Sequence, residues 1–282
     1  MLPTTGFDVR TYARAATRVD PSVVDGDAFR ARPLDADALA TIRYLRRVEQ
    51  STIKHLRDVL VTPSHTDPQV TAFLTTWAYE EFWFADALTA VLRAHSEEEA
   101  ADETSHRRAP SPLRQALNGF GDRASPIWNA VTGNLVGEEF VAAHMTWCAV
   151  DTWLTQAVYS RLVEITDHPA LRDVVVPILA AKSVHLDFYR SEAVVRLESS
   201  RWARRLTRIA LRFGWSPAAA GHDDTGVFGY VLGDRRGKSA IATIDLLIAT
   251  FPGLRGLHPV SSALRRVGIG PRAQPGPYAV RS

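Results

Sequence analysis

Apolar residues recur every three or four positions along four long stretches of the chain, a spacing that predicts amphipathic helices. Asp35 or Asp37 is a suitable N-cap for the first stretch, and Pro68 is a suitable first residue for the second. His168 and Pro169 separate the third stretch from the fourth. No segment alternates apolar and polar residues over a useful strand length, so an all-α fold is expected. The predicted helices cover residues 35–61, 67–95, 137–165 and 169–199.

Segments of weaker periodicity lie before, between and after these helices. Residues 1–34 are punctuated by proline and glycine, which predicts an arm with one short helix laid over the body. Residues 96–112 are charged and contain proline, which predicts an exposed linker. Residues 201–282 predict a helical extension packed on the bundle, with a basic helix first and another near 239–250. The chain is thus expected to comprise an arm, a helical bundle over 35–200 and this extension.

The fourth predicted helix carries ionisable side chains within its apolar face. An unpaired buried charge costs on the order of several kcal/mol. A helix that points a lysine and a histidine inward therefore needs partners for both on its neighbours. Steps of three and four residues place these side chains on one stripe: Ile178, Lys182, His185, Tyr189 and Glu192.

The other three helices also place polar residues within their apolar stripes. In the first helix this residue is Glu49, and in the second it is Glu81, which shares a face with Phe84. Glu80 points away from that stripe, so it is expected to be peripheral. Four helices with inward polar groups predict one shared polar centre. The third helix contributes Met145, Cys148, Thr152, Thr155 and Tyr159 on one face.

The composition indicates a soluble protein with a large core. The chain has 282 residues, of which 46% are hydrophobic, and this is enough to form one large compact body. The single Cys148 excludes a disulfide framework and a thiol-rich metal site, and it suits a reducing cytoplasm. No segment has the length and apolar character of a signal peptide or a transmembrane helix. We therefore expect a cytoplasmic protein without a membrane span.

The net charge of +2 does not indicate nucleic-acid binding. Five arginines lie close together near the start of the predicted extension, and a solvated helix face accounts for such a cluster. No nucleic-acid partner is therefore expected. The five are Arg201, Arg204, Arg205, Arg208 and Arg212.

The inward polar residues resemble the metal site of ferritin-like bundles. In these proteins two metal ions are held by one Glu from each of two helices and a Glu-x-x-His motif from each of the other two. Further segments resemble actinobacterial ferritin-like proteins related to diiron acyl-carrier-protein desaturases. The resemblance covers roughly residues 38–200 and implies a ferritin-like four-helix bundle with additional C-terminal helices. The similar segments include Phe73–Trp83, Ala143–Trp147, His168–Pro169 and His185–Tyr189, with Trp215–Pro217 and Phe251–Leu254 beyond them.

Three of the six metal ligands implied by this resemblance are missing. Phe84 and Lys182 stand where the Glu-x-x-His motifs require a histidine and a glutamate, and Thr152 stands where a single glutamate is required. The sequence therefore resembles the fold of the family more closely than its chemistry. The six aligned positions are Glu49, Glu81, Phe84, Thr152, Lys182 and His185.

Charge counting argues against a diiron centre in this chain. Four carboxylates offset two divalent ions in the family, whereas Glu49, Glu81 and Lys182 together carry one negative charge. A low-dielectric core does not tolerate the positive charge that two ions would add. The expected centre has no cofactor, and Lys182 is paired with both glutamates. The alternative is one iron or manganese ion held by Glu49, Glu81 and His185.

Several functional interpretations remain open. The first is a binding or scaffold subunit, or an enzyme without a diiron centre that uses Lys182, His185 and Tyr189 as acid/base groups. Lys182 is a candidate base or Schiff-base nucleophile in its own right. The alternative is an oxidoreductase with a mononuclear metal or a tyrosine-derived radical. Metal-free ribonucleotide reductase small subunits resemble this pattern, because there too a lysine replaces a glutamate. His185 and Tyr189 also have a purely structural interpretation as core residues.

The family resemblance also bears on partners. It suggests a small hydrophobic or acyl substrate, or a carrier protein that delivers one. A homodimer is compatible with the sequence. Neither nucleic acid nor a membrane span is expected.

Overall fold

The computed structural model describes residues 6–52, 56, 67–95, 138–218, 224–266 and 269. These described residues form helices and contain no β-strand, so the all-α prediction is confirmed for them. Four long helices make up the body of the molecule. They are α3 (Ala36–Gln50), α5 (Pro68–Ala94), α8 (Glu138–Thr166) and α9 (Pro169–Ser199).

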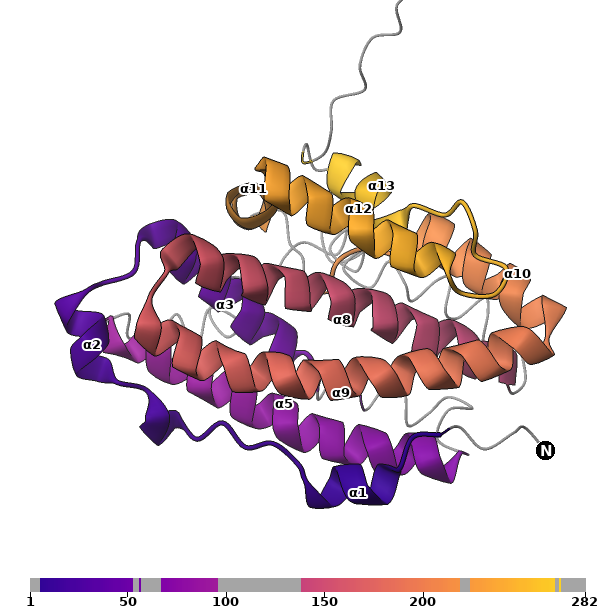
Figure 1. The fold of residues 1–282 in the computed structure, drawn as a ribbon, viewed down its shortest axis with the longest axis horizontal. Coiled ribbons are helices and arrows are strands. Elements are labelled where there is room, and N and C mark those ends of the chain that lie inside the picture. Colours follow the sequence, from indigo (N-terminus) through magenta and orange to yellow (C-terminus); the bar gives the residue numbers. More distant parts are fainter. Residues whose placement is uncertain are drawn as a thin grey trace, which may run out of the picture.

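These four helices pack side by side as a helical bundle (Figure 1). Helix α3 contacts α5 and α8, and helix α9 contacts the same two helices. Residues from all four helices therefore meet at the centre of the bundle. None of the helices in the described part of the chain is long and apolar enough to cross a membrane.

Local capping explains where the long helices begin. The Asp35 carboxylate accepts a hydrogen bond from the backbone N–H of Ala38, and Asp67 caps α5 ahead of Pro68. The His168 ring caps α9 in the same way. These starts agree with the sequence pattern. The predicted continuation of the first helix beyond residue 52 falls almost entirely outside the described residues, and so does the predicted linker 96–112.

The predicted inward stripes are buried. All five residues of the α9 stripe are at most 5% exposed, and Lys182 has the highest value. Glu49 and Glu81 are each 1% exposed, and Phe84 is fully buried. The helical phase read from the sequence therefore places these groups correctly. Because helices pack through such stripes, the polar residues lie in the bundle core.

The N-terminal segment runs along α5. It contains α1 (Val9–Arg14), the 3₁₀ turn η1 (Pro21–Val23) and α2 (Gly26–Ala31), each of which contacts α5. The Phe29 ring stacks on His168 with ring centroids 4.7 Å apart. The arm thus covers one side of the bundle (Figure 1).

The C-terminal helices lie against α8. They are α10 (Arg201–Ile209), the short π-helix η3 (Ala210–Gly214), α11 (Thr225–Leu232), α12 (Arg235–Ala249) and α13 (Pro259–Arg266). Helices α10, α11 and α12 contact α8 directly. The Asp234 cap starts α12 four residues before the predicted position at 239. The division of the chain into domains at residues 34 and 200 stays a prediction.

Candidate functional site

The centre of the bundle is a lysine held by two glutamates. The Lys182 Nζ atom donates to Glu49 Oε2 at 2.7 Å and to Glu81 Oε1 and Oε2 at 2.6 and 2.8 Å. These three residues come from α9, α3 and α5, so the interaction joins three helices of the bundle. The predicted pairing of Lys182 with both glutamates is present in the structure.

This geometry uses the full donor capacity of the lysine. An ammonium group has three N–H donors, and Lys182 directs three hydrogen bonds at carboxylate oxygens. Burial lowers the pKa of Lys182 below its ordinary value, while the adjacent Glu81 carboxylate acts in the opposite direction. The hydrogen bonds themselves suit a charged ammonium, because a neutral amine has only two N–H donors.

A tyrosine on the remaining helix completes this arrangement. The Tyr159 hydroxyl on α8 donates to Glu49 Oε1 at 2.8 Å. Glu49 therefore accepts from Lys182 through one oxygen and from Tyr159 through the other. Charge-assisted hydrogen bonds of this kind offset part of the cost of burying a carboxylate. All four long helices thus contribute a polar group to one network.

Glu80 forms a second buried pair, and the expectation that it would be peripheral is wrong. It is 1% exposed, and its Oε2 atom lies 2.5 Å from His185 Nε2. The Tyr12 hydroxyl donates to the same oxygen at 2.5 Å, and the Thr17 N–H donates to Oε1 at 2.5 Å. Both donors belong to the N-terminal arm. Glu80 is buried because the arm covers the side of α5 that the bundle leaves open.

These contacts change the acidity of Glu80. Burial by itself would raise the pKa of Glu80, but the hydrogen bonds and charge of His185, together with the bonds from Tyr12 and Thr17, lower it below the ordinary value. Glu80 therefore stays ionised beside the histidine. A sequence signal was present in the adjacent acids Glu80 and Glu81, but periodicity within one helix cannot show that a distant arm will cover a residue.

His185 is oriented by Glu80 toward the lysine centre. Its Nε2 atom faces Glu80, while its Nδ1 atom lies 3.5 Å from Glu81 Oε1. Among the described residues Nδ1 has no hydrogen-bond partner. An imidazole held at one nitrogen by a carboxylate presents the other nitrogen in a defined direction, as in protein metal sites. In this chain His185 Nδ1 points toward Glu81, the residue that pairs with Lys182.

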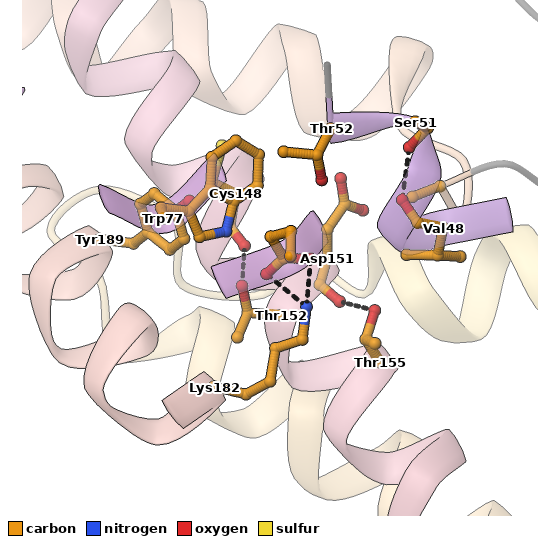
Figure 2. A pocket seen from close by; sticks show the side chains of 12 residues that line it. Val48, Ser51, Thr52, Trp77, Cys148, Asp151, Thr152, Thr155, Lys182 and Tyr189 are labelled. Carbon is orange, nitrogen blue, oxygen red and sulfur yellow. Dashed lines mark hydrogen bonds and ion pairs between the residues drawn. The ribbon is translucent and has the colours of Figure 1, made fainter. Parts of the chain in front are cut away.

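A cavity of about 100 Å³ adjoins the lysine centre (Figure 2). Lys182 and Glu81 line it on one side, and Tyr189 lines it from α9. The Tyr189 hydroxyl is buried and has no hydrogen-bond partner among the described residues. A buried hydroxyl without a partner costs about 1–3 kcal/mol, so a ligand or water that bonds to it is favoured. The other lining residues are Val48, Ser51, Thr52, Trp77, Cys148, Asp151, Thr152, Thr155 and Ala218.

Asp151 also lines the cavity, although the helical pattern places Thr152, and not Asp151, on the inward face of this helix. Its Oδ1 atom accepts a hydrogen bond from Trp215 Nε1 at 2.9 Å. Burial raises the pKa of Asp151 from 3.8 to about 7, against the lowering effect of hydrogen bonds from Trp215 and Trp147. A carboxyl group with this pKa can donate or accept a proton near neutral pH. The sequence pattern of α8 does not predict this environment, because Trp215 reaches Asp151 from a segment outside the four long helices.

The raised pKa of Asp151 predicts a specific pH dependence of stability. The folded protein keeps the proton until about pH 7, whereas the unfolded chain releases it near 3.8. The bound proton therefore stabilises the folded state fully at pH values below the pKa of Asp151 in the unfolded chain. This stabilisation is lost as the pH rises through the pKa of Asp151 in the folded protein. Relative to wild type, Asp151→Asn should gain on the order of a few kcal/mol in unfolding free energy between pH 4 and pH 8. Chemical denaturation at several pH values measures this difference.

A matched substitution controls for general effects of pH. Asp173→Asn replaces an exposed aspartate on α9 and should follow the wild-type profile. Parallel profiles for Asp151→Asn and wild type would show that Asp151 titrates at an ordinary carboxyl pKa. The assignment of Asp151 as an acid/base group would then be withdrawn.

The positions aligned with missing metal ligands surround the same centre. The Phe84 ring centroid lies 5.7 Å from Lys182 Nζ and 6.4 Å from the His185 ring. Thr152 lines the cavity, and its hydroxyl donates to the Cys148 carbonyl at 2.8 Å. A hydrophobic ring and a hydroxyl therefore lie at two of the positions where the resemblance to ferritin-like proteins predicts metal ligands.

The donor set does not fit a diiron centre. Within the described ranges, no three His, Cys, Asp or Glu side chains are arranged to hold a metal ion. The Lys182 ammonium lies between Glu49 and Glu81, where it repels a cation and occupies their oxygens. A mononuclear site with His185 would require Lys182 to leave both glutamates. The assignment of Lys182, His185 and Tyr189 as catalytic residues stays a prediction.

No protein-family model, curated protein or solved structure matches this chain.

Proposed function

We propose that this chain is a ferritin-like protein that works without a diiron centre and binds a small organic molecule beside Lys182. The observation that supports it is the set of three hydrogen bonds from Lys182 to Glu49 and Glu81. In this proposal the Lys182 ammonium takes the place that a metal ion takes in the ferritin-like proteins that the sequence resembles. Metal-dependent oxidation is then replaced by binding and acid/base chemistry.

The cavity indicates the kind of molecule that would bind. A cavity of about 150 Å³ holds benzene, so the space of about 100 Å³ suits roughly four or five non-hydrogen atoms. Tyr189 offers an unpaired hydroxyl, and Asp151 offers a carboxyl group that exchanges protons near neutral pH. A small hydrophobic molecule or short acyl compound with one polar group fits these features. The same proposal includes a carrier protein that delivers the acyl compound to the cavity.

The roles of the predicted catalytic residues differ in this proposal. Lys182 is a poor nucleophile, because its three N–H groups are held by carboxylates. It serves instead to keep Glu49 and Glu81 together at the edge of the cavity. His185 is held by its hydrogen bond with Glu80 and directs Nδ1 toward Glu81 Oε1, 3.5 Å away, and Tyr189 contacts the ligand. Proton transfer to or from the ligand is assigned to Asp151.

A radical-dependent oxidoreductase is the second candidate function. It is favoured by the contact of the buried Tyr159 hydroxyl with Glu49: when an external one-electron oxidant takes an electron from the tyrosine, a carboxylate at 2.8 Å can accept the proton. Electron paramagnetic resonance of the protein as isolated distinguishes the two candidates. A tyrosyl signal that disappears in Tyr159→Phe supports the oxidoreductase, whereas absence of any radical signal supports the first proposal.

Metal analysis tests the main proposal directly. Protein produced in medium with added iron and manganese should contain far less than one metal ion per chain, because the ligand count and the charge both oppose binding. Elemental analysis after gel filtration measures this content, and native mass spectrometry of the same sample detects a retained organic ligand. Two metal ions per chain whose binding is abolished by Glu49→Gln or Glu81→Gln would overturn the proposal.

Location and assembly belong to the same proposal. A cytoplasmic setting suits the one buried thiol, Cys148. A homodimer is compatible with the proposed function, because the cavity lies within a single chain.

A further inference from the structure

Helix α10 and the following π-helix η3 present large apolar side chains to solvent. Trp202, Ile209 and Phe213 are 60%, 49% and 65% exposed. They are separated by seven and four positions, and a helix turns about 100° per residue, so the three side chains lie within about 40° of one another. They form one apolar ridge along roughly 16 Å of helix. Exposures this high mean that the ridge projects outward and does not line a groove.

Exposed arginines flank this ridge. Arg205 lies over the Trp202 ring at 5.3 Å, and Arg212 lies over the Phe213 ring at 5.4 Å. Arg201 is also exposed. Residues 199–222 contain no aspartate or glutamate, whereas the whole chain carries only +2. Positive charge is therefore concentrated here, and the remainder of the chain is net negative. We call Arg201, Trp202, Arg205, Ile209, Arg212 and Phe213 the basic ridge.

The opposite side of the helix is fixed to the body of the protein. Ala203, Thr207 and Leu211 are buried there. Arg204 donates to the Leu197 carbonyl at 2.7 Å, and Arg208 donates to the carbonyls of Gly253 and Arg255, each at 3.1 Å. These two arginines are thus structural. Figure 1 shows α10 at the end of the bundle where α9 ends, and α10 contacts α8 there.

We propose that the basic ridge binds the surface of membranes that contain anionic lipids. Helices with arginine beside Trp, Phe and aliphatic residues lie in the bilayer interface, where the apolar side chains enter the acyl boundary and the guanidinium groups contact phosphates. A projecting ridge suits a deformable bilayer, whereas a protein partner would need a matching groove. Binding to the phosphates of a nucleic acid would use the arginines but not the apolar side chains of Ile209 and Phe213. This inference does not depend on the function proposed for Lys182.

Vesicle co-sedimentation of the full-length protein tests this assignment. The protein should sediment with phosphatidylcholine vesicles that contain phosphatidylglycerol, and only weakly with phosphatidylcholine alone. Replacing two arginines, as Arg205→Gln with Arg212→Gln, should weaken binding about 30-fold, since each basic residue near an anionic surface contributes about fivefold. Trp202→Ser with Phe213→Ser should weaken it at least about tenfold through lost insertion. Binding should also decline as salt is raised.

Matched variants on other surfaces separate this site from general effects. Phe82→Ser removes a side chain on α5 that is 55% exposed, and Arg172→Gln with Arg235→Gln removes two exposed charges. Both controls should sediment like wild type, and every variant should keep the wild-type Tm. Equal losses in the controls, or no sedimentation of the wild type, would overturn the proposal. Two other results would also overturn the proposal if the basic-ridge variants abolished them. One is dimerisation of the wild type, and the other is tighter binding to nucleic acid than to vesicles.

Discussion

Glu81→Ala is expected to lower the free energy of unfolding by about 3–5 kcal/mol. The substitution removes two of the three hydrogen bonds that Lys182 makes and leaves a buried ammonium with Glu49 as its charged partner. It also leaves a cavity where the side chain was, which adds to the loss. Chemical denaturation monitored by circular dichroism measures the change. Glu81→Gln, which keeps the volume, isolates the contribution of charge.

Lys182→Met should have a smaller effect than Glu81→Ala at low pH. Without the ammonium, Glu49 and Glu81 hold a proton between them, because two adjacent buried carboxylates disfavour double ionisation. That proton is lost as pH rises, so the cost of Lys182→Met should increase from pH 5 to pH 8. Glu198→Ala, at an exposed position on the same helix as Lys182, is the control and should be nearly neutral. Equally small effects for Glu81→Ala and Glu198→Ala would contradict the buried ion pair.

Restoring the missing ligands should convert the centre into a metal site. The triple variant Phe84→His, Thr152→Glu and Lys182→Glu rebuilds the donor set of a diiron centre, and we expect it to bind about two iron or manganese ions per chain. We expect this result because the Phe84 ring lies 5.7 Å from Lys182 Nζ and Thr152 lines the cavity beside Lys182. His185 Nδ1 already points there and is held from behind by Glu80. Elemental analysis and calorimetric titration with manganese measure the gain.

The three restorations should depend on one another. Phe84→His alone leaves Lys182 in place and therefore leaves the charge unsuitable for a cation. Lys182→Glu alone gathers carboxylates without enough ligands, so it should destabilise the protein and bind metal weakly. A triple variant with wild-type helicity that binds no metal would mean that the backbone no longer holds these positions in ligand geometry. The ferritin-like interpretation of the centre would then lose its main support.

The sequence by itself determined the four long helices and the pairing of Lys182 with Glu49 and Glu81 in the bundle core. Caps such as Asp67 and His168 mark where the long helices begin, and the 3.6-residue period specifies which side chains share a face. Lys182 and Glu81 were recognisable because an ionisable residue within an apolar stripe needs a partner of opposite charge. This information is local to each helix, so one sequence suffices to read it.

The tertiary structure alone decided which groups surround these residues. Glu80 is buried because an arm more than sixty positions earlier supplies Tyr12 and Thr17 as donors. Asp151 has a raised pKa because the surrounding segments bury it, although Trp215 donates a hydrogen bond to its carboxylate that acts in the opposite direction. Burial and acidity at such positions depend on contacts between distant segments. Periodicity within one helix carries no information about those contacts, because the covering segment is not part of that helix.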